Sequence, residues 1–181
     1  KYMSGKMSSD CSQIIWSHAL TWTNLNHQIK RVHVVFMAHF DVGYTDNSVS
    51  DLLHRYATQW FPAAFQTAKE VRDYGKGPQQ FAWTSHPWLI AALLKNQSGN
   101  IPPSFIEELK ASIKNDTIRW HANPMNMQSE VGERFNMEYG MTLATELDNR
   151  FGKQKKITAS QKDEPGMTLG MVRMFADAGV K

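Results

Sequence analysis

The hydrophobic and polar positions of this chain follow two alternating patterns. Short apolar or β-branched runs predict four strands, at residues 31–36, 80–84, 117–121 and 156–160. Apolar residues at helical spacing predict five helices, at residues 47–74, 87–95, 104–114, 133–151 and 168–178. Pro62 predicts a break in the first helix near Trp60, and Ser104 with Glu107 resembles a capping box.

Strands that alternate with helices are typical of an α/β fold with parallel strands and right-handed crossovers. The first strand, residues 31–36, is apolar enough to be buried on both faces. Residues 1–30 show little periodicity, so we expect an irregular N-terminal extension followed by one domain over residues 31–181. Four β/α units are present, whereas a complete β/α barrel typically needs about 250 residues.

Composition narrows the class of protein. The chain has 181 residues, of which 41% are hydrophobic, and this is enough for one domain with a real core. Its net charge of +3 comes without a basic patch interleaved with aromatic residues, so we do not expect nucleic acid as a partner. Cys11 is the only cysteine, which excludes an intrachain disulfide. The sequence has no stretch of about 18 apolar residues, so we expect neither a transmembrane helix nor a membrane as a partner.

A His-x-Asp pair stands where the first strand should end. His39 and Asp41 lie two residues apart, and Gly43 permits a sharp bend after them. On an extended backbone this spacing puts both side chains on the same face. An imidazole nitrogen and a carboxylate oxygen suit a zinc-like ion. The alternative is an ordinary Asp-Val-Gly turn with a histidine packed beside it.

Polar residues follow the other predicted strands as well. In parallel α/β folds, functional groups gather at the carboxyl ends of the strands. The residues at these ends are Thr84, Ser85 and His86 after the second strand, His121 to Glu130 after the third, and Gln161, Asp163 and Thr168 after the fourth.

The run Val-His-Val-Val that begins at Val32, followed by His39-x-Asp41-x-Gly-Tyr, resembles the opening signature of the glycoside hydrolase family 38 α-mannosidases. The form Asp-Val-Gly-Tyr-Thr-Asp is more similar still to an uncharacterised branch of that superfamily. The resemblance covers residues 31–181 and corresponds to the first half of the family's catalytic domain. It implies a parallel β/α barrel of the glycoside hydrolase/deacetylase type, with about the first four β/α units present. It also implies zinc, or another divalent metal, on His39 and Asp41.

The loop after the third strand departs from the family pattern. There the family carries an aspartate that is both nucleophile and zinc ligand, but residues 121–130 contain no aspartate. Glu130 is the only carboxylate close by, so we expect it to be the catalytic residue. Its alternative role is an exposed acid at the N-terminus of the next helix, where the helix dipole favours it.

Three further residues are candidates for contacts with a sugar. Trp83 belongs to a run that resembles the family's Phe-x-Trp segment, and Asp163 to one that resembles its Asp-Pro-Phe-Gly-His-Ser turn. His121 ends a strand directly. Each has a structural alternative: an aromatic packing corner for Trp83, a turn that Asp163 closes by bonding its own backbone, and a core position for His121.

The resemblance therefore implies a retaining, metal-dependent glycoside hydrolase with a carbohydrate substrate. The family's remaining histidine ligand lies beyond the position of Lys181, so we do not expect hydrolysis by these residues alone. One alternative is a deacetylase-like metal hydrolase of the same barrel class, in which water is the nucleophile. Another is a non-catalytic carbohydrate-binding remnant. An incomplete barrel would expose apolar strand edges, which predicts self-association.

Overall fold

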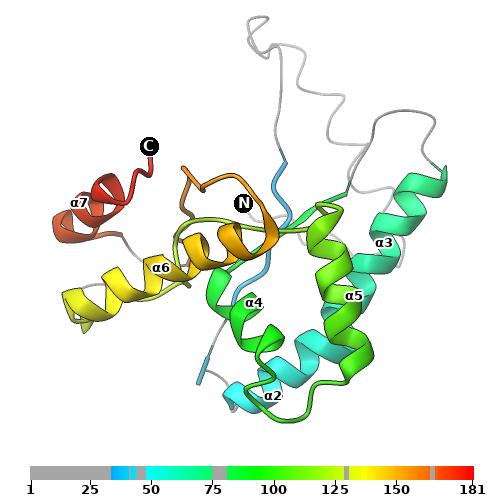
Figure 1. The fold of residues 1–181 in the computed structure, drawn as a ribbon. Helices are drawn as coiled ribbons and strands as arrows, with labels where there is room; N and C mark the ends of the chain where they lie inside the picture. The colour runs from blue at the N-terminus through cyan, green and yellow to red at the C-terminus, as the bar shows by residue number, and fades with distance from the viewer. Residues whose placement is uncertain (1–33, 41, 44–47, 75–80, 129–130, 164–165) are drawn as a thin grey trace, which may run out of the picture. The chain divides into compact units, whose positions relative to one another are not determined.

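Helices and short parallel strands alternate along the chain (Figure 1). The computed structural model describes residues 34–40, 42–43, 48–74, 81–128, 131–163 and 166–181. Residues 35–181 form one compact unit. The predicted N-terminal extension, residues 1–30, lies outside the described residues. Among the described helices, none has both the length and the apolar character that crossing a bilayer requires.

The predicted helices are confirmed, with small shifts of their ends. In chain order the elements are α2 (Val49–Arg55), η1 (Tyr56–Trp60), α3 (Phe61–Tyr74), β1 (Trp83–Ser85), α4 (Pro87–Leu94), α5 (Pro103–Lys114), β2 (Ile118–Trp120), α6 (Arg134–Phe151) and α7 (Leu169–Asp177).

The predicted break near Trp60 is a π-helical turn, η1, between α2 and α3. Pro62 has no backbone N–H and cannot donate to the carbonyl of Thr58, so the regular ladder is interrupted there. The N–H of Phe61 instead donates to the carbonyl of Tyr56, one residue further back than in an α-helix.

The capping box predicted at Ser104 is wrong. Helix α5 begins one residue earlier, at Pro103, and its N-cap is Pro102, which makes no side-chain cap bond. Proline is favoured at the first helical position because its missing N–H has no partner there in any case. The carboxylate of Glu107 is bonded by Lys110, three residues on.

The strands lie side by side in chain order. Strand β1 pairs with β2 in parallel, with Trp83 opposite Ile118 and Ser85 opposite Trp120. On the other side of β1, Phe36 forms a parallel bridge with Trp83. Beyond β2, the N–H of Ala122 donates to the carbonyl of Thr158 at 2.8 Å. Sequential parallel neighbours agree with the predicted α/β fold, and a barrel stays a prediction.

The first predicted strand is not buried where the structure describes it. Val35 is 62% exposed and Phe36 is 49% exposed. Among the described residues, this segment has a bridge to β1 and to no other strand. An open apolar edge is the feature from which self-association was predicted, and that association stays a prediction.

The fourth predicted strand, residues 156–160, does not form. Side chains and the chain end take its backbone groups instead: the N–H of Lys156 donates to Asp148, and the carbonyl of Ser160 accepts from Asn123. The carbonyl of Ile157 accepts from the N–H of Lys181. The segment therefore stays beside β2 without forming a ladder.

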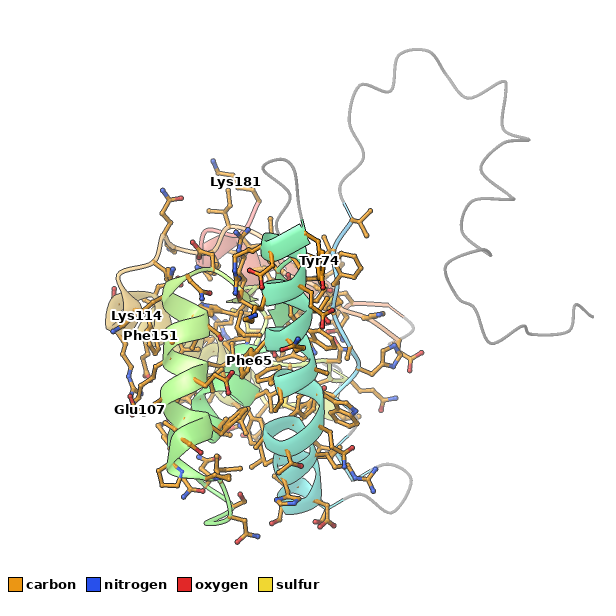
Figure 2. All side chains as sticks on the ribbon, turned by 90° about the vertical axis from the view of Figure 1, so that its right-hand side faces the viewer. Phe65, Tyr74, Glu107, Lys114, Phe151 and Lys181 are labelled. Atoms are coloured by element: carbon orange, nitrogen blue, oxygen red, sulfur yellow. The ribbon has the colours of Figure 1, made fainter. Side chains whose placement is uncertain are left out.

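The main core lies between the sheet and the helices that cover it. Figure 2 shows α3 and α5 side by side, with Phe65 between them. Phe105 of α5 stacks on both Phe61 and Phe65, at centroid distances of 6.4 and 6.1 Å. A second cluster joins α6 to α7 through Met137, Met141, Met171 and Phe175. Burial of these large side chains supplies the driving force for folding.

A buried carboxylate connects β2, α6 and the segment after α6. Asp148 of α6 is 4% exposed, and it accepts hydrogen bonds from the indole N–H of Trp120 at 3.0 Å and from Lys156 Nζ at 2.7 Å. Lys156 also lies over the Trp120 ring, 4.7 Å from its centroid. Removing one member leaves a buried charge without its partner, which is costly.

We predict that Lys156→Met lowers the free energy of unfolding by about 3 kcal/mol, because Asp148 loses its charged partner. Lys69→Met is the matched control: it breaks the Lys69–Asp73 pair, in which both side chains are more than half exposed, and should cost under about 1 kcal/mol. Urea denaturation measures both. Equal effects of the two substitutions would contradict the role given to Asp148.

Helix α6 packs closely on the loop that follows β2. A Cβ added at Gly140 would lie 2.8 Å from Cγ and 3.0 Å from Cβ of Pro124. The carbonyl of Pro124 in turn accepts from the N–H of Trp88 in α4 at 3.2 Å. Gly140 therefore sets the distance between α6 and a loop that is itself fixed to α4.

We predict that Gly140→Ala destabilises the chain by about 1–3 kcal/mol, although alanine is the better helix former, because the methyl group collides with Pro124. Gly170→Ala in α7 is the control, since its Cβ would meet nothing closer than 3.9 Å. Thermal unfolding should show a loss for the first variant and none for the second. A gain at Gly140 would show that the loop moves freely.

Candidate functional site

Three histidines follow neighbouring segments of the sheet. His86 comes directly after β1, His121 directly after β2, and His39 three residues after the bridge at Phe36. Because the strands are parallel, their carboxyl ends meet at one edge. The rings of His86 and His121 are in contact, with centroids 4.9 Å apart and planes at 89°.

His39 is joined to the last of the four segments. Its Nδ1 lies 3.2 Å from Oδ2 of Asp163, and the side chains are 37% and 69% exposed. Asp163 has a left-handed backbone with φ of 65°, a conformation that aspartate adopts more readily than most residues. The hydroxyl of Tyr56 donates to the carbonyl of His39 at 2.8 Å, which fixes the end of this segment to η1.

The other two histidines are buried. His86 is 2% exposed and His121 is 4% exposed, and neither ring nitrogen of either residue has a hydrogen-bond partner. Asn123 is also buried, and its amide nitrogen donates to the carbonyl of Ser160 and to Gln161, while its Oδ1 has no partner. Buried polar atoms without partners are rare and costly, and they tend to mark functional positions.

Burial keeps both imidazoles neutral at pH 7. It lowers the pKa of His86 to about 4, with a further contribution from His39 nearby. It lowers the pKa of His121 to about 3, and here His86 adds to the effect. A neutral imidazole offers a lone pair to a metal ion, or one donor and one acceptor to a polar ligand.

The structure brings some of the predicted site residues together and places others elsewhere. Asp163 and His39 are brought together, and His121 lies at the same edge. Trp83 is the first residue of β1 and packs against Phe61 of α3, with centroids 6.5 Å apart, which favours its interpretation as a packing residue. Asp41 and Glu130 lie outside the described residues.

His86 is a candidate that sequence reasoning left without a role. The available signal was its place directly after a predicted strand and before a helix that begins with Pro87. The register supplies what the sequence lacked: Ser85 pairs with Trp120, so the next residues along the two strands are His86 and His121.

The described residues fit a metal by the chemistry of their donors. Imidazole nitrogens and a carboxylate are suitable ligands for zinc. The orphaned nitrogens of His86 and His121 are at the same sheet edge as the first and fourth segments. Within the described part of the chain, however, no three His, Cys, Asp or Glu side chains are grouped as a metal site.

Comparison of the chain with protein-family models, with curated proteins and with solved structures finds no match. The interpretation of this site therefore depends on its own geometry and chemistry.

We predict that the chain loses stability between pH 6.5 and about pH 4 when a chelator is present. The unfolded histidines have a pKa near 6.5, while the folded values of His86 and His121 are about 4 and 3. In this window the unfolded chain binds more protons, so stability is full above pH 6.5 and falls as the pH falls. Each histidine contributes up to about 1.4 kcal/mol per pH unit.

Urea denaturation at a series of pH values checks this. The matched control is the double variant His86→Leu, His121→Leu, which lacks both titrating groups and should show a shallower pH dependence. The same slope for the wild-type chain and the double variant would mean that these two histidines do not titrate as their burial requires.

Proposed function

We propose that this chain is the N-terminal part of the catalytic domain of a metal-dependent glycoside hydrolase, of the retaining, α-mannosidase-like type. The observation that carries the proposal is the 3.2 Å contact between His39 and Asp163. These residues follow the first and the last of four adjacent segments, and histidines follow the two strands between them. Polar groups that converge at the carboxyl edge of parallel strands are the usual basis of an active site in α/β proteins.

In this proposal His39 and Asp41 hold the divalent metal. Asp163 accepts a hydrogen bond from His39 or from a sugar hydroxyl, and so orients the ligand histidine, as carboxylates commonly do around metals. A bound divalent ion supplies positive charge that holds sugar hydroxyls and favours distortion of the ring.

Glu130 supplies the catalytic carboxylate. A retaining glycosidase uses two carboxyl groups about 5–5.5 Å apart, one as nucleophile and one as acid/base. Glu130 would attack the anomeric carbon while the glycosidic C–O bond breaks and the acid/base carboxyl group protonates the leaving oxygen. The covalent glycosyl–enzyme intermediate would then be on Glu130, in place of the aspartate that the mannosidase pattern has in this loop. His121, neutral and beside the strand end, carries a ring N–H that can donate to a sugar hydroxyl. The assignment of Trp83 to the sugar site stays a prediction.

A deacetylase-like hydrolase is the second candidate, and one observation favours it. Residues 121–128, the described part of the loop after β2, contain no carboxylate. A reaction in which water is the nucleophile does not need one there. Release of acetate from an N-acetylated sugar would support this candidate, and release of a reducing sugar with retained anomeric configuration would support the glycosidase.

We predict that zinc binds the 181-residue chain and that His39→Ala and Asp41→Ala each weaken this binding at least tenfold, since each removes a first ligand of the proposed metal. His54→Ala is the matched control, because His54 is an exposed histidine of α2 that has no role in the proposed site, and its loss should not change the affinity. Isothermal titration calorimetry measures all four proteins. Zinc binding that is indifferent to both site variants would contradict the assignment of His39 and Asp41.

The sugar is tested separately, by titrating methyl α-mannoside into the zinc-loaded chain and into the chain with a chelator. Binding that requires the metal and is weakened by Asp163→Ala is the expected result. Binding that survives the chelator would support the non-catalytic carbohydrate-binding alternative instead.

A further inference from the structure

The proposed function gives His86 no role, and it uses only one of the two ring nitrogens of His121. The two residues are nevertheless a matched pair: they extend the register in which Ser85 faces Trp120, and their rings are in contact. We propose that His86 and His121 form a metal site of their own, for a late first-row divalent ion such as Zn²⁺, Ni²⁺ or Cu²⁺. This site does not depend on the assignment of His39 and Asp41.

The distance between the rings fits two ligands of one ion. A metal–nitrogen bond is about 2.0–2.1 Å, so the centre of a ligating imidazole lies about 3.2 Å from the metal. Two such rings are about 5.2 Å apart at a tetrahedral angle and about 4.5 Å apart at a right angle, the angle of a square-planar ion. The observed separation of 4.9 Å lies between these values.

The state of the rings also fits. All four ring nitrogens are buried without a partner, so a metal would take lone pairs that no hydrogen bond occupies. Oδ1 of Asn123, two residues after His121, is a buried oxygen without a hydrogen-bond partner in the same loop, and we assign it as the third ligand of the ion. Imidazole nitrogen is the ligand type that zinc, nickel and copper share, which gives the chemical class of the ion.

Rigid elements hold both positions. His86 is the N-cap residue of α4 and is followed by Pro87, which fixes the backbone there. The residue after His121, Ala122, donates to Thr158, and the loop beyond is tied to α4 by the bond from Trp88 to Pro124. Two ligands that directly follow adjacent, paired strands are therefore preorganised before any ion binds.

The test is a calorimetric titration of Zn²⁺ into the chain and into His86→Leu, His121→Leu, His39→Ala and the control His54→Ala. We expect His86→Leu and His121→Leu each to weaken one binding event at least tenfold, while His54→Ala leaves it unchanged. Loss of this event only in His39→Ala would overturn the proposal and support the metal of the proposed function. Two zinc-binding events, one lost in His86→Leu and His121→Leu and the other lost in His39→Ala, would support both sites. No zinc binding by the unsubstituted chain would overturn both.

A second measurement does not depend on whether the variants fold. Electron paramagnetic resonance of the unsubstituted chain with one equivalent of Cu²⁺ reports the nitrogens bound to the ion. Coupling to two imidazole nitrogens is expected from His86 and His121, and coupling to one or none would overturn the site. Because the ring nitrogens lack partners, leucine should not lower the melting temperature of the chelator-treated chain, and this distinguishes loss of a ligand from loss of the fold.

Discussion

The parallel pairing of β1 with β2 is the interaction on which the rest of this structure depends. Each strand has only three residues, so their ladder is held by the helices packed on it more than by its own hydrogen bonds. Leu93 of α4, Ile113 of α5 and Ile118 of β2 itself are fully buried in the core. The register that results brings His86 and His121 to the same edge of the sheet, and every chemical inference about this chain begins from that edge.

This arrangement leaves polar atoms buried without hydrogen-bond partners, which is energetically unfavourable. Four imidazole nitrogens and one amide oxygen are buried without hydrogen bonds around the ends of β1 and β2. Buried polar groups are normally paired, as around Asp148, where a tryptophan and a lysine both donate to one carboxylate. A local departure from that rule is what physical reasoning expects at a site made to bind something.

Sequence patterns located the helices well, because each helix buries one face and shows it as a period. The break near Trp60 was predictable as well, because the missing N–H of Pro62 acts on the adjoining helical turn. The failure at residues 156–160 has a non-local cause, since Asp148 and Asn123 take the backbone groups that a strand would have used. His86 could not be paired with His121 from the sequence because register depends on packing across the sheet.

The candidate site was predicted in outline. The rule that polar groups gather at the carboxyl ends of parallel strands selected His39, His121 and Asp163, and the structure brings His39 and Asp163 into contact. The same rule selected Asp41 and Glu130, and the resemblance to the α-mannosidases gave them their expected roles in metal binding and catalysis. Both residues lie outside the described residues. Trp83 was chosen because its run resembles the family's Phe-x-Trp segment, but its partly buried ring packs against the core beside Phe61.

The most direct test of the central claim, that two neutral imidazoles are buried together at this edge, is long-range ¹H–¹⁵N NMR of the chelator-treated chain labelled with ¹⁵N-histidine. The chain has seven histidines, and we predict that His86 and His121 keep the nitrogen shifts of neutral rings at about pH 5. One of these two signals should be absent from His86→Leu and the other from His121→Leu. Protonation of all seven histidines near pH 6.5 would contradict the account.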